Sequence, residues 1–304
     1  MKIAAVVVTY NDDYKLKEWV EYHKLYENEL YKHIIVDNSS NKEYLQTVRK
    51  AFPHSKILER KTNGGSTSAY NDGIKEALSD ELIDAIVLIA NDIKLEKGGI
   101  SNLYKFLKSN IEFGMVSPVL LRKDSDIIDD LGCEISKSLY MKPYDVGKTI
   151  SNIPPVKRIV SSITGGMNMA SREFYEKVGL QDENLFMYSD EVDMALRASK
   201  CGFKMAVSSE IKSWHQHINP SNRTLRLSYT YYLMGRNKLY LARKHFGFIK
   251  IVGVLFYQLL ICSKMFLTGL LNWRKIVAST YFIWGIINGL SGNMKVYNFI
   301  KSNN

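Results

Sequence analysis

The stretch IAAVVVTYN, residues 3–11, predicts a short buried strand that ends in polar residues. Similar apolar runs stand at residues 33–36 (HIIV) and 85–90 (AIVLIA), and a weaker one stands at 57–58. Apolar residues at helical spacing separate these runs, as in the segment around Trp19. Strands that alternate with helices predict an α/β fold with a mainly parallel central sheet.

Each predicted strand is followed by residues with polar side chains or by glycine. The four segments are Thr9-Tyr10-Asn11, Asp37-Asn38-Ser39-Ser40, Asn63-Gly64-Gly65 and Asn91-Asp92. In open α/β sheets, ligands bind at the carboxyl ends of the strands. The sequence therefore predicts a ligand site built from these four segments.

The chain after residue 100 has a less regular pattern. A further strand is predicted at residues 114–121, a loop-rich segment at 122–160, and helices at 171–178 and about 190–200. Ser171 stands at the expected N-cap of the first of these helices, where its hydroxyl can accept a hydrogen bond from the first turn. The regular alternation of strands and helices therefore belongs to the first hundred residues.

The composition is that of a globular protein. The chain has 304 residues, of which 46% are hydrophobic and 24% charged, so wholesale disorder and fibrous repeats are excluded and one or two domains are expected. A mean hydropathy of -0.17 is too polar for a protein that crosses a membrane many times. The N-terminal apolar run is short and lacks a small-residue cleavage site, so it predicts a strand and not a signal peptide. Cys133, Cys201 and Cys262 exclude a disulfide scaffold and a cysteine zinc cluster, and are typical of a reducing cytosol.

The positive charge is confined to the last third of the chain. Lys and Arg number 41 and Asp and Glu 31, which gives a net charge of +10. The last acidic residue is Glu210, and 13 Lys or Arg follow it, so the first 210 residues carry a net charge of -3. A basic surface of this kind binds either nucleic acid or an anionic membrane.

The same region carries long uncharged stretches, at residues 251–263 and 276–294. Basic residues mixed with Trp, Tyr and Phe predict amphipathic helices that lie on an anionic membrane surface. Two alternatives are a helical subdomain packed on the core and a membrane-spanning helix, which needs about 20 apolar residues. Nucleic-acid binding is disfavoured, because long apolar runs do not suit a groove that follows phosphates.

Three further motifs follow the polar strand ends in order. They are TGGMNMASREF at residues 164–174, ENLFMYSDEVDMALR at 183–197 and SWHQH at 213–217. The whole set resembles glycosyltransferase family 2 and is most similar to its rhamnosyltransferase-like and galactofuranosyltransferase-like branch. The resemblance runs from Lys2 to about His217, and more loosely through Arg236-Asn237 and the glycines at 285, 289 and 292. It implies the GT-A nucleotide-diphospho-sugar transferase fold and transfer of a sugar from a nucleotide donor to a hydroxyl, with inversion at the anomeric carbon.

The resemblance, together with the charge and amphipathic pattern of the last third, divides the chain. Residues 1–222 are expected to form the GT-A catalytic domain, with a nucleotide-binding half at about 1–100 and an acceptor-binding half at 101–222. Residues 223–304 are expected to form a basic, amphipathic helical region that associates with the membrane.

The implied donor site includes most of the polar strand ends. Asp37 can accept a hydrogen bond from the imide N–H of uracil or thymine, although Asp-Asn-Ser-Ser is also ordinary turn sequence. Gly64 and Gly65 would let the backbone approach a ligand closely. Arg236 would meet the diphosphate or a lipid phosphate, or else lie on a solvated helix face. The residues expected to bind the nucleotide sugar are Thr9, Tyr10, Asn11, Asp37, Asn38, Asn63, Gly64, Gly65, Asn71, Asn91, Asp92, Gly165, Gly166 and Arg236.

A divalent cation, Mg²⁺ or Mn²⁺, is expected to neutralise the leaving diphosphate. The family motif Asp-x-Asp stands here as Ala90-Asn91-Asp92, so the first carboxylate is missing. The expected metal ligands are Asp92 and, from the SWHQH motif, His215 in preference to His217. The alternative is that Asp92 only caps the end of a strand.

Glu191 and Asp190 are the expected catalytic residues. A positioned carboxylate can take the proton of an acceptor hydroxyl as the hydroxyl attacks. The base of the family is the second acid of a Glu-Asp pair; the order here is Asp-Glu, so Glu191 matches it and Asp190 is the alternative. Asp193 is expected to orient the site from the same helix face. Another interpretation of all three is favourable acidic charge at a helix N-terminus.

These expectations combine into an inverting, metal-dependent hexosyltransferase at the cytoplasmic face of the cell membrane. The first choice of reaction is transfer of rhamnose from dTDP-rhamnose to a growing, lipid-linked cell-surface polysaccharide. UDP-hexose and UDP-galactofuranose are alternative donors, and the oligomeric state is left open. A sugar nucleotidyltransferase is disfavoured, because TYNDDYK at residues 9–15 stands where that class needs a glycine-rich, basic loop. The missing acid at Ala90 keeps a membrane-associated scaffold with a degraded site as the non-enzymatic alternative.

Overall fold

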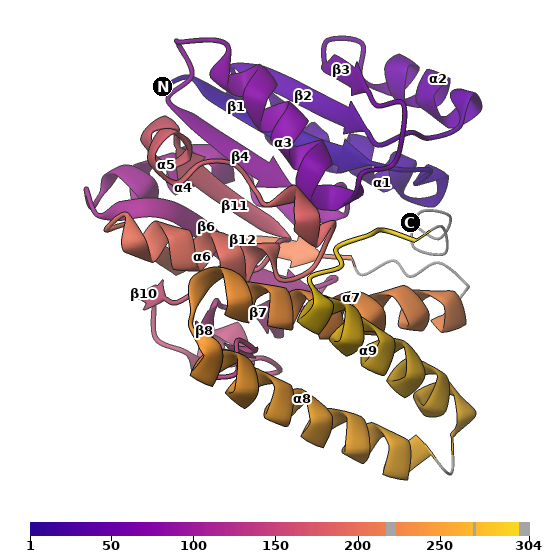
Figure 1. Ribbon diagram of the computed structural model, residues 1–304. Helices are drawn as coiled ribbons and strands as arrows, with labels where there is room; N and C mark the ends of the chain where they lie inside the picture. Colours follow the sequence, from indigo (N-terminus) through magenta and orange to yellow (C-terminus); the bar gives the residue numbers. More distant parts are fainter. Residues whose placement is uncertain (217–222, 270–271, 298–304) are drawn as a thin grey trace.

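The protein is built around one mixed β-sheet with helices on both faces (Figure 1). The computed structural model describes residues 1–216, 223–269 and 272–297. The strands are β1 (Ile3–Thr9), β2 (Lys32–Asp37), β3 (Lys56–Glu59), β4 (Ala85–Ile89), β5 (Ile93–Leu95), β6 (Phe113–Arg122), β7 (Ile128–Asp130), β8 (Cys133–Ile135), β9 (Met141–Pro143), β10 (Lys157–Val160), β11 (Met167–Ser171) and β12 (Lys204–His215). The α-helices are α1 (Asp13–His23), α2 (Lys42–Ala51), α3 (Gly65–Leu78), α4 (Gly99–Lys108), α5 (Arg172–Val178), α6 (Asp190–Lys200), α7 (Arg223–His245), α8 (Phe248–Gly269) and α9 (Trp273–Ser291). Short 3₁₀ helices are η1 (Glu27–Glu29), η2 (Ile150–Asn152) and η3 (Glu183–Leu185).

The central sheet runs in the order β10-β12-β6-β11-β4-β1-β2-β3. β1 pairs in parallel with β2 and β4, β2 pairs in parallel with β3, and β6 with β12. Along this path of described strands, β10 and β11 run the other way. Because β1, β2, β4, β6 and β12 share one direction, their carboxyl ends lie at one edge of the sheet.

Both faces of the sheet are buried. Alternate residues of β1 point to opposite faces: Ala4 and Val6 pack into the core that contains α3, α5 and α6, and Ile3 and Val7 pack into the core that contains α1, α2 and α4. Burial on both sides explains why the strands read as continuous apolar runs. The predicted α/β fold with mostly parallel central strands is confirmed.

Two elements bring residues to the carboxyl edge of the sheet. Helix α3 begins at Gly65, whose left-handed φ of +81° turns the chain into the helix. Strand β12 continues past a bulge between Ser208 and Lys212 and then pairs with β5 and β6. It therefore reaches His215 and carries this histidine to the sheet edge.

The segment 122–160, expected to be loop-rich, contains the short strands β7 to β10. β7 pairs with the end of β6 just before it, and β10 pairs with β12, which lies far away in the sequence. Both strands are only three or four residues long, so the sequence pattern does not mark them. The predicted N-cap is confirmed: Ser171 Oγ accepts a hydrogen bond from the Phe174 N–H at 3.1 Å.

The C-terminal helices α7, α8 and α9 pack together beside the sheet, which confirms the predicted C-terminal helical region (Figure 1). α7 and α9 pack so closely that any side chain at Gly285 of α9 would collide with the carbonyl oxygen of Tyr232 of α7. Leu239 of α7 shares a buried cluster with Leu185 and Val192, so these helices are fastened to the region around α6. Among the described residues, α8 is the one helix that is long and apolar enough to cross a membrane.

Candidate active site

The carboxyl edge of the sheet brings several predicted donor-site residues together. Thr9 at the end of β1 lies opposite Asp37 at the end of β2, and both side chains are buried. Asp37 Oδ2 accepts a hydrogen bond from the Ser40 N–H at 3.0 Å, so Asp37 does cap a turn. Its other oxygen, Oδ1, is buried and has no hydrogen-bond partner among the described residues. The turn role therefore leaves one acceptor open for a ligand.

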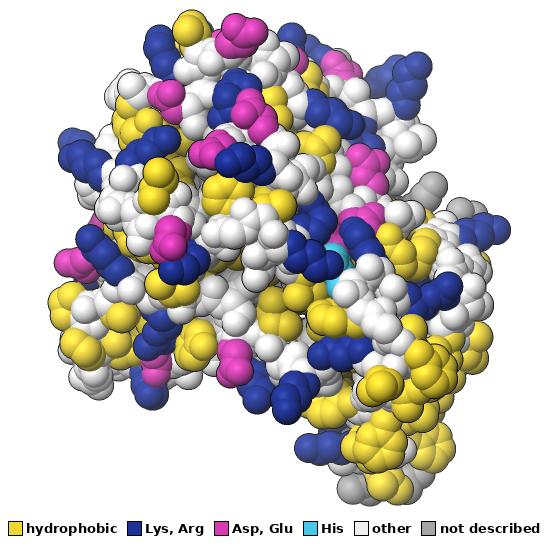
Figure 2. Space-filling model, turned by 60° about the vertical axis from the view of Figure 1, so that its left-hand side comes forward, with side chains coloured by type: hydrophobic (Ala, Val, Ile, Leu, Met, Phe, Trp, Pro, Cys, Tyr) yellow, Lys and Arg dark blue, Asp and Glu magenta, His cyan; other side chains and the backbone are white. Residues whose placement is uncertain are grey.

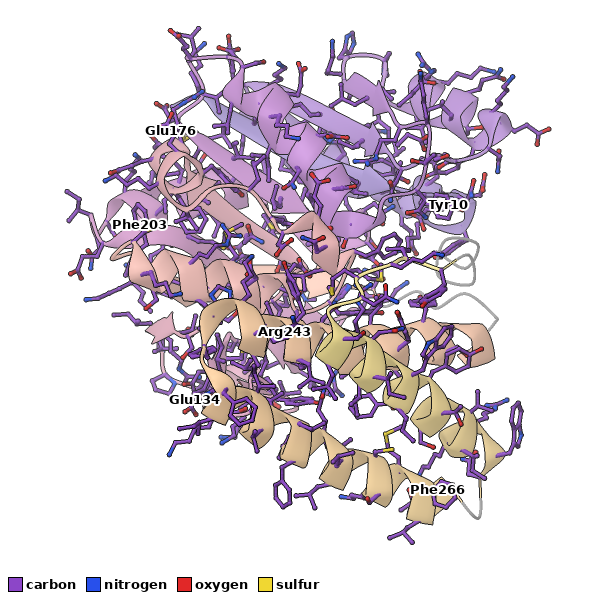
Figure 3. All side chains as sticks on the ribbon, in the orientation of Figure 1. Tyr10, Glu134, Glu176, Phe203, Arg243 and Phe266 are labelled. Carbon is purple, nitrogen blue, oxygen red and sulfur yellow. The ribbon has the colours of Figure 1, made fainter. Side chains whose placement is uncertain are left out.

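Tyr10 and Asn11 form the turn after β1, and Tyr10 lies at the sheet edge in Figure 3. Asn11 has a left-handed φ of +48°. Its N–H donates to Ser40 Oγ at 2.9 Å, and its Oδ1 accepts from the Asn41 N–H at 2.9 Å. Asn11 thus ties the turn after β1 to the turn after β2.

Asn38 connects the end of β2 to the glycine pair. Its Nδ2 donates to Asn63 Oδ1 at 2.9 Å, and its Oδ1 accepts from the Gly64 N–H at 3.2 Å. A side chain at Gly65 would collide with the carbonyl group of Phe186, in the turn before α6. The glycine pair was expected to let the backbone approach a ligand closely. In the structure, Gly65 lets the start of α3 approach the turn before α6.

Asn71 lies on α3, and its side chain is hydrogen-bonded to other residues of the protein. Its Nδ2 donates to the Gln181 carbonyl and to Glu183 Oε1, both at 2.9 Å, and its Oδ1 accepts from the Gln181 N–H at 2.9 Å. These bonds occupy both amide hydrogens, so the structure gives no support to the predicted nucleotide contact. Asn71 instead fixes the backbone of Gln181.

Asp92 lies in a buried cluster of charged groups. Lys15 Nζ is 3.0 Å from Asp92 Oδ2, and His215 Nε2 is 3.5 Å from Asp92 Oδ1. Burial alone would raise the pKa of Asp92, but the bond to His215 and the charge of Lys15 outweigh burial and hold this pKa well below its usual value. Asp92 is therefore a fixed negative charge at neutral pH.

His215 is held between two carboxylates. Its Nδ1 is 3.4 Å from Asp129 Oδ2, on the side away from Asp92. Burial alone would lower the pKa of His215, but Asp129 and Asp92 together raise it to about 9. A cation that binds the imidazole has to displace this proton. His217, the other predicted candidate, lies outside the described residues.

Asn91 links the neighbours of Asp92. Its Nδ2 donates to Asp12 Oδ2 at 2.8 Å, and its Oδ1 accepts from Lys15 Nζ at 3.3 Å. No sequence motif pointed to Asp12, Lys15 or Asp129. The run TYNDDYK did show charges after the first strand, but a run of charges does not show which of them face the sheet edge.

A metal site at this edge would have few protein ligands. Within the described ranges, no group of three or more His, Cys, Asp or Glu side chains is arranged to hold a metal ion. Asp92 and His215 offer one ionised carboxylate and one imidazole side by side. Mg²⁺ is often held by one or two protein carboxylates together with substrate phosphates and water. The donor set therefore fits a cation whose coordination is completed by a bound diphosphate.

The turn before α6 is strained. Phe186, Tyr188 and Ser189 have left-handed φ values of +65°, +64° and +69°. Such conformations are unfavourable for non-glycine residues and persist where surrounding contacts hold them. Asn237 of α7 supplies such contacts, because its Nδ2 donates to three carbonyl oxygens of residues 185–188 at 2.8, 2.9 and 3.1 Å.

Arg236 is the second residue that holds this turn. Its guanidinium donates to the carbonyl oxygens of Asn184 and Leu185 at 3.0 Å each, and to that of Met294 at 3.1 Å. The side chain is completely buried, so the solvated-face interpretation is wrong. Its donors are used on the protein backbone, and the structure gives no support to the predicted phosphate contact. Arg236 instead shapes the turn from within the protein.

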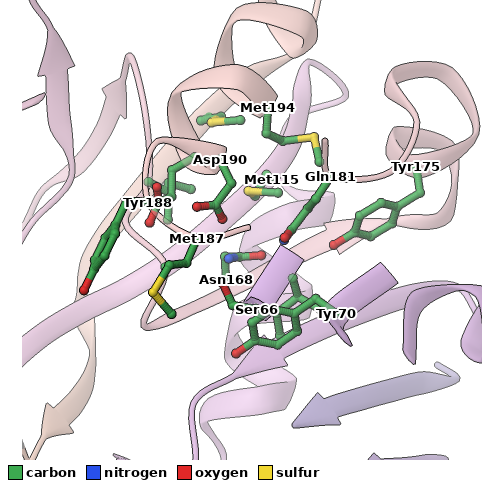
Figure 4. Close-up of a pocket in the computed structure, with 15 residues that line it drawn as sticks. Ser66, Tyr70, Met115, Asn168, Tyr175, Gln181, Met187, Tyr188, Asp190 and Met194 are labelled. Carbon is green, nitrogen blue, oxygen red and sulfur yellow. The ribbon is translucent and has the colours of Figure 1, made fainter. Parts of the chain in front are cut away.

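The turn presents Asp190 and Glu191 at the N-terminus of α6, where both line a cavity of about 240 Å³ (Figure 4). Burial, together with the charge of Glu191, raises the pKa of Asp190 well above its usual value. Glu191 Oε2 is buried and has no hydrogen-bond partner among the described residues. Asp190 therefore keeps its proton to higher pH, and Glu191 is the carboxylate placed to accept one.

Gly165 and Lys238 lie near this pair, and Gly166 connects Gly165 to the Asp92 turn. A side chain at Gly165 would lie 2.9 Å from Glu191 Oε1, so this glycine makes room for the carboxylate. The Gly166 carbonyl accepts from the Ala90 N–H at 3.0 Å, which places Gly166 beside the Asp92 turn. Lys238 of α7 is buried, and burial lowers its pKa to about 8 against the opposing charge of Glu191. No motif pointed to Lys238, because it stands in a helix of many basic residues.

Asp193 contacts α7. It is completely buried and lies 2.8 Å from Arg197 Nε, 2.7 Å from Lys244 Nζ and 2.7 Å from His245 Nε2. These ion pairs fasten α6 to the end of α7. Any orienting effect of Asp193 on the site therefore acts through the position of α6.

Residues 4–179, more than half of the chain, match the sequence profile described as Glycosyl transferase family 2. The chain belongs to this family. The glycosyltransferase is 26% identical over 265 residues to the hexosyltransferase Agl10 of low-salt glycan biosynthesis in Haloferax volcanii, which covers 84% of this chain and 82% of the relative. It is 29% identical over 219 residues to the dTDP-rhamnosyl transferase RfbF of Shigella flexneri, covering 70% and 68% of the two chains.

A third relative of the glycosyltransferase is the N-acetylglucosaminyl-diphospho-decaprenol L-rhamnosyltransferase of Mycobacterium tuberculosis, at 20% identity over 239 residues, covering 73% of this chain and 78% of the relative. These matches confirm the predicted resemblance to the rhamnosyltransferase-like branch. Among solved structures, the mannosyltransferase PcManGT from Pyrobaculum calidifontis, in complex with GDP-Man and Mn²⁺, has a TM-score of 0.58 at 12% identity and covers 95% of this chain and 87% of that chain. The predicted GT-A fold is confirmed.

Proposed function

We propose that this glycosyltransferase moves one sugar from a nucleotide-diphosphate donor to a hydroxyl of its acceptor, with inversion at the anomeric carbon. The observation that carries the proposal is Glu191 Oε2, a buried carboxylate oxygen that lines a cavity and has no partner among the described residues. The acceptor hydroxyl donates to this oxygen and passes its proton to it while the hydroxyl oxygen attacks C1 of the sugar. The bond between C1 and the diphosphate oxygen breaks, and the nucleoside diphosphate leaves. One displacement completes the transfer without a covalent enzyme intermediate.

The carboxyl edge of the sheet is the proposed donor site. Asp37 Oδ1 accepts the imide N–H of thymine or uracil. Lys15, beside Asp92, contributes positive charge toward the diphosphate. The first choice of donor is dTDP-rhamnose, because two relatives are named as rhamnosyltransferases. UDP-hexose and UDP-galactofuranose are the alternatives.

Asp92 and His215 are the residues that would hold Mg²⁺ or Mn²⁺ at this edge, together with the donor diphosphate. A bound divalent cation neutralises charge on the leaving diphosphate. Asp129 contacts the other ring nitrogen of His215 and so orients the imidazole.

The acceptor is proposed to be a growing, lipid-linked glycan at the cytoplasmic face of the cell membrane. Figure 2 shows hydrophobic side chains gathered at the protruding lower end of the molecule, and Figure 3 shows Phe266 of α8 at this end. Basic residues such as Lys250 and Lys264 accompany them, and no acidic residue follows Glu210. This combination suits an anionic membrane surface, with residues 223–304 as the attachment region. The exposed apolar side chains of α8 include Phe248, Ile249, Val252, Phe256, Leu259, Leu260, Phe266 and Leu267.

A donor screen tests the proposed reaction. Purified protein with Mn²⁺ or Mg²⁺ and a polyprenyl-diphosphate-linked sugar acceptor should release nucleoside diphosphate from dTDP-rhamnose. We expect the rate to be at least about tenfold higher than with UDP-glucose, UDP-galactose or UDP-galactofuranose, because binding sites that match all polar groups of a ligand reject analogues strongly. Release from none of these donors would contradict the transferase proposal and favour a scaffold.

Vesicle binding tests the proposed membrane attachment. The protein should sediment with vesicles that contain phosphatidylglycerol and much less with pure phosphatidylcholine vesicles. Replacing Phe256 and Leu260, which are 63% and 52% exposed, with serine should weaken this binding about tenfold or more, since a buried Phe or Leu side chain contributes about 1.5–3 kcal/mol. The matched control is Leu82→Ser, a leucine 59% exposed outside these helices, which should bind as the wild type does. Equal binding of the double variant and the wild type would contradict the assignment of α8.

A further inference from the structure

The cavity beside Asp190 and Glu191 concentrates polar atoms that the protein leaves without partners. Asn168 Oδ1, Tyr175 Oη, Gln181 Oε1 and Glu191 Oε2 are all buried, have no hydrogen-bond partner among the described residues, and belong to residues that line this cavity. Figure 4 shows Asn168, Gln181 and Tyr175 directed toward the space between Asp190 and Tyr70. Native proteins leave few buried polar atoms unsatisfied. Four in one cavity indicate a molecule that enters and bonds to them.

The chemistry of these atoms restricts the molecule. The amide oxygens of Asn168 and Gln181 can only accept hydrogen bonds, a carboxylate oxygen of Glu191 likewise accepts, and the Tyr175 hydroxyl can donate or accept. A ligand that satisfies them must therefore present several donors, as the hydroxyls of a sugar ring do. An anionic ligand is disfavoured, because it would place further negative charge against Glu191.

Much of the remaining wall of the cavity is apolar. Met115 of β6, Met194 of α6 and Met205 of β12 contribute to it, together with Leu88 and Ile163. None of these side chains can replace the water that a hydroxyl loses when it is buried. A methyl group loses nothing there, and flexible methionine side chains adapt to its shape. The wall therefore favours a ring that carries a methyl group where ordinary hexoses carry a hydroxymethyl group.

The size and place of the cavity identify the ring as that of the donor. At about 240 Å³, the cavity is smaller than the sites of drug-sized ligands, which are about 300–1,000 Å³, so it holds one ring. Ser66 and Tyr70, which follow the glycine pair at the start of α3, form part of its lining. The cavity therefore borders the start of α3, directly after the glycine pair of the proposed donor site, and also contains the catalytic pair.

We infer that this cavity binds the sugar ring of the donor and selects a 6-deoxyhexose. The hydroxyls of the ring bond to the oxygens of Asn168, Tyr175 and Gln181, its methyl group lies against the methionine side chains, and Glu191 Oε2 is left for the hydroxyl of the acceptor. The inference rests on the proposed transferase function and names its substrate class. Asn71 contributes indirectly, because its bonds to Gln181 fix the backbone that carries one of the acceptor oxygens.

The test compares dTDP-L-rhamnose with dTDP-L-mannose, which differ only in the hydroxyl on C6. Affinities are measured by calorimetry with Mn²⁺ and without acceptor, so that the measured difference reflects binding of the donor sugar only. The wild type should prefer the rhamnose donor by about 10–100-fold, the range in which an apolar pocket rejects one added hydroxyl. Met194→Gln offers a partner to that hydroxyl and should reduce the preference to within about threefold, whereas Met194→Leu keeps the wall apolar and should preserve the preference. Met115→Gln and Met115→Leu repeat the comparison from another strand, and only variants with a wild-type melting profile are compared.

The possible results distinguish the inference about the cavity from the proposed transferase function. Equal affinity of the wild type for the two donors, or a preference unchanged in both glutamine variants, would overturn the inference and leave the transferase proposal standing. Faster turnover of UDP-glucose or UDP-galactose than of the deoxy donor would do the same. A deoxy preference that appears only toward the terminal sugar of the acceptor would overturn the assignment of the cavity to the donor. Failure to bind or use any nucleotide sugar would contradict both the inference about the cavity and the transferase proposal.

Discussion

Glu191→Gln is expected to lower kcat by about 10²–10⁴-fold, the usual contribution of a positioned general base. The amide keeps the shape of the side chain but cannot take a proton from the acceptor hydroxyl. Donor affinity should stay within about twofold of the wild type, because the proposed nucleotide contacts lie at the sheet edge, away from Glu191. Steady-state kinetics with a lipid-linked acceptor, combined with calorimetric donor binding, measure both quantities.

Asp190→Asn is the matched control for this substitution. Because Asp190 already favours its protonated form in the folded protein, the variant should lose much less activity than Glu191→Gln. Near-complete loss of activity in Asp190→Asn, with Glu191→Gln little affected, would assign the base to Asp190 and contradict the account.

The same control has a stability signature. The raised pKa of Asp190 means that folding stabilises its protonated form, fully below the ordinary carboxyl pKa of about 4. This stabilisation is lost as the pH rises through the folded-state pKa. Asn is neutral at every pH, so the Tm advantage of Asp190→Asn over the wild type should grow, by about 2–4 °C, as the pH rises from about 4, the ordinary carboxyl pKa, toward neutral pH. An unchanged difference across this range would contradict the burial of a protonated Asp190.

Asp92→Asn is the second change with a large expected effect, a fall in kcat/KM of about 10²–10³-fold. The substitution removes the ionised carboxylate that contacts both Lys15 and His215. A cation at a leaving diphosphate supplies several kcal/mol of charge stabilisation, and Asp92 is the one carboxylate retained from the family motif. Initial rates over a range of Mn²⁺ concentrations measure the loss, and the remaining activity should no longer respond to the metal.

Asp12→Asn is the control for Asp92→Asn. Asp12 belongs to the same cluster and is 3.8 Å from Lys15, but it contacts neither His215 nor the proposed metal position directly. The control should keep its response to Mn²⁺. Wild-type activity and metal response in Asp92→Asn would show that the donor diphosphate is neutralised by other groups, with Lys15 as the first candidate.

The strand-end residues could be predicted from sequence because the geometry of a parallel sheet determines where they lie. A polar residue after a buried parallel strand must lie at the carboxyl edge, so Thr9, Asp37 and Asp92 come together without knowledge of any side-chain contact. The register of β1 with β2 then places Thr9 opposite Asp37. The acidic start of α6 was predictable for a similar reason, because Asp190 and Glu191 stand in the first turn of a helix with a clear end at Gly202.

Contacts between distant elements could not be predicted in this way. Asp129 stands on β7, a strand of three residues, and its contact with His215 joins β7 to the end of β12, far away in the sequence, so the sequence pattern around Asp129 did not predict it. Arg236 and Lys238 stand in a strongly basic helix, where a charge normally faces water. The structure buries both, because α7 packs between the turn before α6 and α9. Burial of a charged residue is decided by its neighbours in space.

The anomeric configuration of the transferred sugar tests the account most directly. A single displacement, in which Glu191 deprotonates the acceptor hydroxyl, inverts the configuration at C1. The one-bond carbon–proton coupling at C1 of the product, measured by NMR after transfer from dTDP-rhamnose by purified protein, reports this configuration. We expect inversion relative to the donor. Retention of configuration would contradict it, because retention requires a mechanism other than the single displacement proposed at Glu191.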